Sequence, residues 1–118
     1  GYYAQDFEAV VDMVDVADIK SIETGFIQDV GSWILLPKYV EFYTSTDGVN
    51  FKKIATVNHN VADNDYRQQI YNFRCEPANC KARYVKVFAK YYGKLPEWHI
   101  GAGGDTHLFV DEIEIVEK

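Results

Sequence analysis

The sequence contains no long apolar segment and no run of basic residues. No stretch approaches the roughly 20 apolar residues that a membrane-spanning helix needs, so we expect no membrane insertion. The formal net charge is −6, from 18 acidic and 12 basic residues, whereas binding to phosphate backbones or anionic lipids requires positive charge. We therefore predict that neither nucleic acid nor an anionic membrane is a partner.

Cysteine is scarce. Cys75 and Cys80 flank a Pro-Ala-Asn turn, and this spacing fits either a local disulfide or two free thiols. Both alternatives stay open. A structural zinc site needs four ligands, and the absence of a second Cys/His pair nearby argues against one.

No window of a dozen residues keeps a helical period of apolar positions. Short alternating segments recur instead: residues 7–13 place Phe7, Ala9, Val11 and Met13 on one face of a predicted strand. Further strands are predicted at residues 19–27, 39–45, 54–57, 70–73, 83–91 and 108–116. Such strands, without crossover helices, predict an all-β fold, an antiparallel jelly-roll β-sandwich. The length of 118 residues fits a single domain.

Two predicted loops contain large aromatic residues and glycines where no strand period exists. In residues 28–37, Trp33 follows Gln28 and Asp29. An exposed Trp offers a flat apolar platform for a sugar ring, and neighbouring polar side chains can bind its hydroxyls. The alternative is that Trp33 caps the end of the core.

In the second loop, residues 92–106, Glu97, Trp98 and His99 precede a Gly-Ala-Gly-Gly stretch. Glycines allow backbone amides to approach a ligand closely. We expect Trp98 to stack on a ligand and Glu97 and His99 to hydrogen-bond its hydroxyls. The alternative for His99 is a surface or packing role.

Other chemistry is less well supported by the sequence. Glu97, His99, Asp105 and His107 resemble a metal cluster only weakly, because they are scattered through a loop. Asp29, Glu97 and Asp105 would supply carboxylates for glycoside hydrolysis, but a small sandwich leaves little room for a distorted sugar. We therefore predict no catalysis by this chain. Residues 60–71, which include Tyr66 and Arg67, are predicted to be solvated surface. The alternative is that Tyr66 and Arg67 line the edge of a binding cleft.

Three segments carry a family resemblance. Residues 22–51 (IETGFIQDVGSWILLPKYVEFYTSTDGVNF) and 82–90 (ARYVKVFAK) resemble the discoidin, or coagulation factor 5/8 type C, family. Residues 90–115 (KYYGKLPEWHIGAGGDTHLFVDEIEI) are similar to the C-terminal domain of bacterial family-20 β-hexosaminidases, or chitobiases. The order and spacing of the segments match over residues 7–116.

The resemblance implies a galactose-binding-like jelly roll of carbohydrate-binding module family 32. Such a module would hold a secreted, cell-surface or periplasmic bacterial β-N-acetylhexosaminidase on glycans bearing GlcNAc, GalNAc or galactose, and catalysis would belong to another domain of the same chain. The two loops would share one end, so that Gln28 or Asp29 closes the polar side of a cleft with Trp98.

The resemblance further implies that no cofactor is required and that a structural Ca²⁺ could bind at Glu112. Family members normally begin with a strand and an Asp-Gly loop before the segment matching residues 7–13. We therefore expect residues 1–118 to form a single module truncated at its N-terminal strand, a fragment of a larger glycosidase.

Two other functions compete with sugar binding. A domain that only packs against the catalytic domain predicts that Trp33, Leu35 and Leu36 form an exposed apolar patch. Adhesion to protein or lipid is a third hypothesis, but the neutral or acidic loop tips do not suit anionic lipid.

Overall fold

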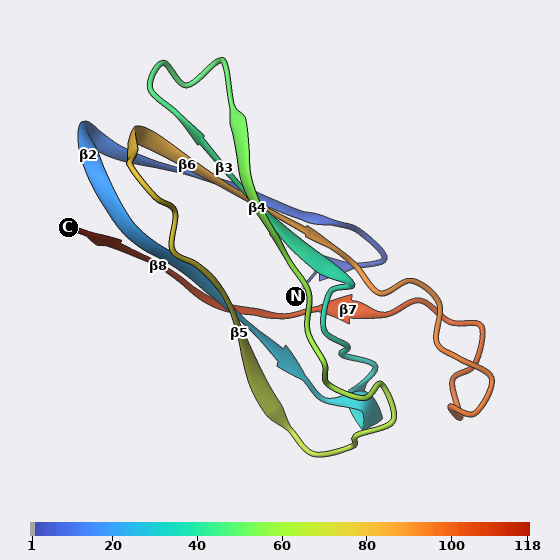
Figure 1. The fold of residues 1–118 in the computed structure, drawn as a ribbon. Helices are drawn as coiled ribbons and strands as arrows, with labels where there is room; N and C mark the ends of the chain where they lie inside the picture. Colours follow the sequence, from blue (N-terminus) through green and yellow to red (C-terminus); the bar gives the residue numbers. More distant parts are fainter. Residues whose placement is uncertain (1) are drawn as a thin grey trace.

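The computed structural model describes residues 2–118, which are built mainly from β-strands (Figure 1). The strands are β1 (Tyr2–Tyr3), β2 (Phe7–Gln28), β3 (Tyr39–Ser45), β4 (Lys52–Val57), β5 (Gln69–Cys75), β6 (Cys80–Lys90), β7 (His107–Leu108) and β8 (Val110–Glu117). A short 3₁₀ helix, η1 (Val30–Ser32), follows β2, and this part of the chain has no α-helix. All strand pairings are antiparallel. The prediction of an antiparallel all-β fold is confirmed.

Strand β2 bends and takes part in both layers of the sandwich. Its first part pairs with β6 from Phe7 to Asp12, and its second part lies between β5 and β8. The pairing with β6 is irregular between Asp12 and Ala17, where Val14 has φ 77° and donates its N–H to Asp12 Oδ1 at 2.8 Å. The two strands predicted at residues 7–13 and 19–27 are therefore one continuous strand. A local bulge lets the backbone change direction without ending the strand.

The two layers follow from these pairings. One contains β4, β3, β6 and the first part of β2, and the other contains β5, the second part of β2 and β8. Strands β1 and β7 form a small separate sheet. Figure 1 shows the two layers diverging from the strand crossing near the middle of an elongated molecule, whose extents are 48 × 23 × 18 Å.

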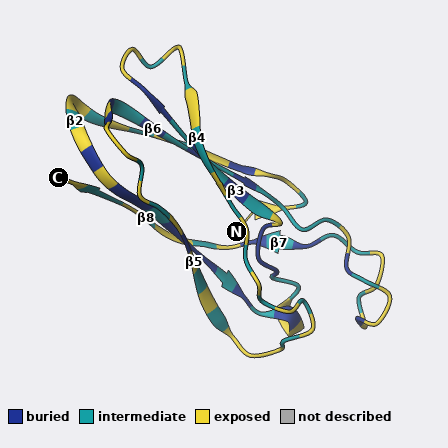
Figure 2. Cartoon of the chain, viewed as in Figure 1, coloured by how far each residue is buried: buried dark blue, intermediate teal, exposed yellow. Residues whose placement is uncertain are grey.

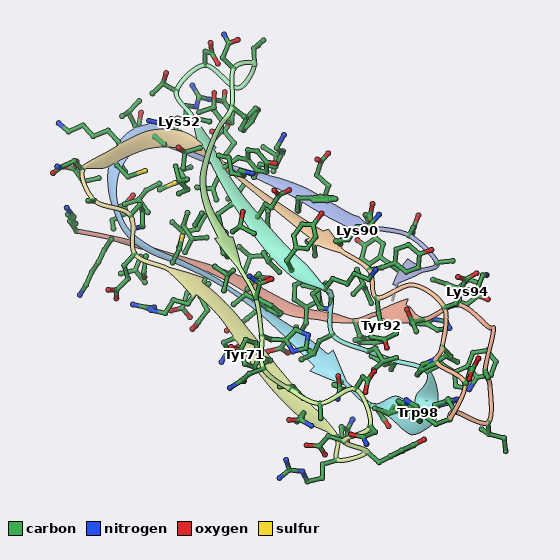
Figure 3. All side chains as sticks on the ribbon, turned by 45° about the vertical axis from the view of Figure 1, so that its right-hand side comes forward. Lys52, Tyr71, Lys90, Tyr92, Lys94 and Trp98 are labelled. Atoms are coloured by element: carbon green, nitrogen blue, oxygen red, sulfur yellow. The ribbon has the colours of Figure 1, made fainter. Side chains whose placement is uncertain are left out.

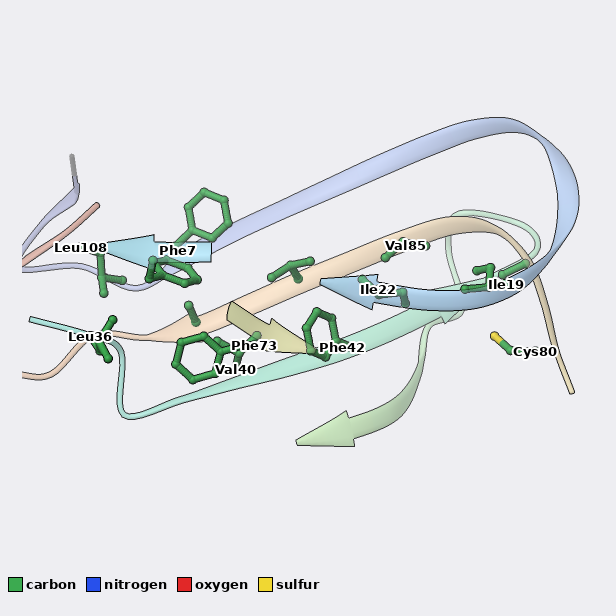
Figure 4. Packing of buried hydrophobic residues seen from close by; sticks show 14 residues of the cluster. Phe7, Ile19, Ile22, Leu36, Val40, Phe42, Phe73, Cys80, Val85 and Leu108 are labelled. Atoms are coloured by element: carbon green, nitrogen blue, oxygen red, sulfur yellow. The ribbon is translucent and has the colours of Figure 1, made fainter. Parts of the chain in front are cut away.

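The core lies between the layers, and buried positions alternate with less buried ones along β3 and β6 (Figure 2). Phe26 is fully buried and meets Phe7 and Phe73 edge to face, with ring centroids 5.9 Å apart in both pairs. Figure 4 labels Phe7, Val40, Phe42 and Phe73 among the residues of this core cluster. Because β2 contributes Phe7 from its first part and Phe26 from its second, core packing holds the bend in place.

Residues 46–51 form the turn that connects β3 to β4. Asp47 Oδ1 accepts the backbone N–H groups of Val49 and Asn50, each at 2.8 Å, and Gly48 has φ 77°. These hydrogen bonds hold the pKa of the Asp47 carboxyl well below its usual range. The hairpin end of the sandwich is thus fixed by local hydrogen bonds.

Cys75 and Cys80 are free thiols. Cys80 lies in the core and Cys75 packs against it. Burial raises the pKa of the Cys75 thiol to about 11, which keeps it in the unreactive neutral form at neutral pH.

Within residues 2–118 there is no helix with the length and apolar character required to cross a membrane.

Candidate functional site

Three loops meet at the end of the sandwich away from the β3–β4 hairpin. They comprise residues 28–37, 58–68 and 92–106, and Figure 3 labels Tyr92, Lys94 and Trp98 in this region. A second, smaller apolar cluster joins the 28–37 loop to the 92–106 loop. It consists of the buried Val30, Leu35 and Leu95, with Trp33 and Tyr92 packed against them.

Trp33 packs against this apolar cluster. Asp29 and Ile34 exchange backbone hydrogen bonds of 2.8 and 3.0 Å, which closes a tight loop around η1. Trp33 at its end adopts a left-handed conformation with φ 65°, and its N–H donates to Val30 O. The side chain is half-buried. The expectation of an exposed platform at Trp33 is therefore corrected in favour of the alternative: Trp33 caps the core.

The glycines of the 92–106 loop explain this burial. A Cβ at Gly101 would lie 2.5 Å from Trp33 Cζ2, and a Cβ at Gly104 would lie 2.8 Å from Trp33 Cζ3. Both distances are too short for real atoms, so these two positions require glycine. The Gly-Ala-Gly-Gly stretch was expected to bring amides near a ligand, whereas Gly101 and Gly104 let the backbone press against the Trp33 indole.

His99 contacts Val30 and Trp33 of this cluster, and only 3% of it is exposed. Its Nε2 lies 2.8 Å from Val30 O, and its Nδ1 accepts the Gly101 N–H at 2.8 Å. These partners require a neutral ring that carries its proton on Nε2. With both nitrogens engaged, His99 has no group free for a sugar hydroxyl. The ligand-binding expectation for His99 is corrected to a structural role.

Gln28 also has a positioning role. It is 1% exposed, and its Nε2 donates to the carbonyls of Ala62 and Asp65 at 3.0 and 3.3 Å. Its Oε1 lies 3.5 Å from Leu36 N. The expectation that Gln28 contacts a ligand is corrected: the side chain ties the 58–68 loop to the 28–37 loop.

The exposed aromatic groups of this end are Tyr66 and Trp98, at 53% and 45% exposure. Their ring centroids are 6.1 Å apart at an interplanar angle of 68°. Both rest on His99: Tyr66 stacks on it at 6.2 Å and 12°, and Trp98 lies 5.9 Å away. We call Tyr66 and Trp98 the aromatic pair. Trp98 is accessible, and Tyr66 lies beside it, as in the alternative that places Tyr66 at the edge of the cleft.

Strand periodicity does not distinguish Tyr66, because its loop lacks any apolar period. The useful signal would have been an aromatic residue in an otherwise polar loop. The Gln28 hydrogen bonds, which are non-local, bring this loop to Trp98.

Polar residues flank Tyr66 and Trp98 in the sequence. Arg67 donates from Nε and Nη2 to both carboxylate oxygens of Asp65, at 2.9 and 2.6 Å, while its own side chain remains 80% exposed. This guanidinium holds the pKa of the Asp65 carboxyl well below its usual range. Glu97, next to Trp98, is exposed. A hollow of about 350 Å³ is lined by Ile27 and by residues 68–70, which follow Arg67 in the sequence.

Other groups of this end bond to each other. Asp29 is half-buried and accepts the Ser32 hydroxyl at 3.1 Å, so the loop itself already uses part of its carboxylate. Tyr92 donates its hydroxyl to Asp63 at 2.7 Å. Burial and this hydrogen bond raise the pKa of Tyr92 to about 12.

The candidate metal ligands do not converge. Asp105 pairs with Lys94 at 3.1 Å, and His107 packs against the Tyr3 ring at 4.6 Å. Glu112 is exposed on β8. Residues 2–118 contain no group of three or more His, Cys, Asp or Glu side chains able to hold a metal ion. The calcium site that the resemblance implies uses backbone carbonyls together with the Glu112 carboxylate, and it stays a prediction.

The apolar patch required by the domain-packing hypothesis is missing at its predicted place. Leu35 and Leu36 are each 1% exposed, and both pack inside this chain. That hypothesis therefore loses the surface on which it depended.

Comparison with known proteins supports the fold. No protein-family model matches the chain, and no curated protein does. A solved structure of CBM32-3 from a family 31 glycoside hydrolase of Clostridium perfringens matches with a TM-score of 0.59 and 13% identity, over 100% of this chain and 70% of that one. CpGH89CBM32-6 from the same organism matches with a TM-score of 0.56 and 15% identity, over 96% and 70% of the chains.

A third match is CpGH89CBM32-5 of Clostridium perfringens, solved in complex with GalNAc-β-1,3-galactose. Its TM-score is 0.52 and its identity 18%, over 92% of this chain and 68% of that one. The chain therefore has the fold of family-32 carbohydrate-binding modules, and the discoidin-like resemblance is confirmed at the level of the fold.

Proposed function

We propose that this chain is a non-catalytic carbohydrate-binding module that binds sugar on the aromatic pair, Tyr66 and Trp98. The observation that carries the proposal is the contrast in exposure around His99. His99 is buried and Trp33 is half-buried, yet Tyr66 and Trp98 remain about half exposed at the tips of two different loops. Exposed aromatic rings fixed on a buried base are pre-organised for a ligand.

The chemistry of the pair suits a sugar ring. Aromatic faces bind the apolar C–H face of a sugar, while nearby polar groups bind its hydroxyls. Glu97 supplies a carboxylate acceptor next to Trp98, and the Arg67 guanidinium next to Tyr66 is oriented by Asp65. Asp29 is a weaker candidate because Ser32 already occupies one of its oxygens.

We further propose that the module tethers a bacterial β-N-acetylhexosaminidase to glycans bearing GlcNAc, GalNAc or galactose. Two observations support this ligand class: the sequence resemblance to chitobiase C-terminal domains, and a structural neighbour solved with GalNAc-β-1,3-galactose. Tethering raises the local concentration of a linked catalytic domain on its substrate. Such an enzyme would act in the periplasm, at the cell surface or after secretion.

The test is a titration with GlcNAc, GalNAc, galactose and chitobiose, monitored by protein-observed NMR. We expect saturable binding of at least one sugar with a Kd of roughly 0.1 to 1 mM, because a small ligand buries few atoms. Trp98→Ala and Tyr66→Ala should each weaken binding by about three- to tenfold. Phe109→Ala is the matched control, since Phe109 is 43% exposed and lies outside the three loops. A flat response to all four sugars from the folded protein would refute the proposal.

A further inference from the structure

A second hollow lies in the region where β3, β4 and the turn before β6 come together. Its volume is about 360 Å³, and its walls are Thr44, residues 52–54 and residues 77–81. Figure 3 labels Lys52 at one end of the molecule and Trp98 near the other. We call the hollow lined by Thr44, residues 52–54 and residues 77–81 the lysine hollow. Its volume lies within the range of small-molecule sites.

The charge of this hollow is opposite to that of the whole chain. Lys52, Lys53 and Lys81 line it, and its lining contains no carboxylate, although the chain carries a net charge of −6. Lys53 Nζ is 3.1 Å from Glu41 Oε2. Within residues 2–118, neither Lys52 nor Lys81 forms an ion pair within 4 Å, even though Asp18 lies opposite Lys81 in the β2–β6 ladder. Two ammonium groups therefore lack a carboxylate partner at this distance.

The strand register places Lys52 in the hollow. Lys52 pairs with Thr44, which also lines the hollow. An irregularity in β4 lies next to this pair: Phe42 pairs with Ala55 and Tyr43 pairs with Lys53, so Ile54 has no opposite residue on β3. A bulge of this kind re-aims neighbouring side chains and is often found beside binding sites.

The opposite wall offers further donors. Asn79 has φ 49°, a left-handed conformation that Asn tolerates better than most residues. Neither Ala78 nor Asn79 donates its backbone N–H to a backbone acceptor within the described chain. Thr44 adds a hydroxyl to the lining. Ammonium groups combined with N–H and O–H donors are the partners that an oxyanion requires.

We infer that the lysine hollow binds a small oxyanion group. The group is either a free inorganic ion or the carboxylate or sulfate substituent of an acidic sugar, and both present the same chemistry to Lys52 and Lys81. The inference does not depend on the aromatic pair, which lies in other loops.

The test is a titration of the ¹⁵N-labelled protein with sodium sulfate, glucuronate and N-acetylglucosamine 6-sulfate, with NaCl keeping the ionic strength constant. Glucose serves as the neutral probe. We expect saturable shifts at the amides of Lys52, Asn79 and Lys81 with an anion and none with glucose. Saturation by sulfate alone assigns the site to free ions, and saturation by an acidic sugar assigns it to a sugar substituent.

Variants distinguish a specific anion-binding site from nonspecific electrostatic attraction of the anion to the protein. Lys52→Gln and Lys81→Gln should each raise the Kd about three- to tenfold. Lys38→Gln removes the same charge from an exposed lysine outside the hollow and should leave the Kd unchanged. Shifts that do not saturate, or equal losses in the Lys38 and Lys52 variants, would overturn the inference. Sugar binding at the aromatic pair is followed through the amide signals of other residues. A negative result at the lysine hollow therefore does not decide the outcome of the sugar titration.

Discussion

The two tryptophans of this chain lie in neighbouring loops and contact the same histidine, yet their environments differ. Trp33 is covered by Gly101 and Gly104 and packs with the Val30 cluster, whereas Trp98 is 45% exposed beside Tyr66. The difference shows that an aromatic residue in a loop can form either the support or the contact surface of a site. The role of the aromatic residue depends on how closely a neighbouring backbone can approach its ring. Gly101 and Gly104 allow a close approach to Trp33.

The largest effect should follow from removing the support. Trp33→Ala should lower the free energy of unfolding by about 2 to 4 kcal/mol, because truncating a packed Trp leaves a cavity. Urea denaturation of the variant and wild type measures this. The same change at Trp98 should cost less than about 1 kcal/mol, as is usual for exposed positions. Equal losses of unfolding free energy in the two variants would contradict the assignment of Trp33 as a support and Trp98 as a contact surface.

A smaller effect is expected from filling the space over the indole. Gly101→Ala should cost about 1 to 3 kcal/mol, because the new Cβ would lie 2.5 Å from the Trp33 ring and force the loop to move. Gly31→Ala is the matched control. Its Cβ would meet only Asp29 Oδ1 at 3.9 Å, so its thermal midpoint should stay close to that of the wild type. A stable Gly101 variant would contradict the described packing.

Gln28→Ala tests the connection between the loops. The change leaves the carbonyls of Ala62 and Asp65 without this donor, and we expect a loss of about 1 to 2 kcal/mol in unfolding free energy. Because the 58–68 loop carries Tyr66, sugar affinity should also fall, although Gln28 is buried away from the ligand. Unchanged affinity in a destabilised variant would show that this anchor does not position Tyr66.

The smallest expected effect is on the stability of the protein at acidic pH. His59, also in the 58–68 loop, packs on Tyr71 and Phe73, its Nδ1 accepts the Val61 N–H, and burial lowers its pKa. Since the unfolded chain binds the proton more readily, the stability from neutral His59 is present above the unfolded pKa of about 6.5 and is lost as the pH falls through the folded value. Urea midpoints between pH 7.5 and 5 should fall less in His59→Gln. Parallel curves would exclude this contribution.

The strands could be predicted from alternation because each buries one face in a common core, as Phe7 and Phe26 do. The continuity of β2 could not, since it depends on a local bulge at Asp12 and Val14 that no periodic pattern encodes. Trp98 and Glu97 are accessible, as the sequence suggested. The positions of Gln28, His99 and Tyr66 depended on contacts between loops distant in sequence, so polar residues expected to bind ligand instead hold the loops together.

The most direct test of the account uses the two indole N–H signals of the wild-type protein in an NMR titration with the sugar that binds best. Contact with the aromatic pair should shift the Trp98 signal strongly and saturably, while the Trp33 signal moves little. A dominant shift of Trp33 with a static Trp98 signal would contradict the assignment of the binding surface.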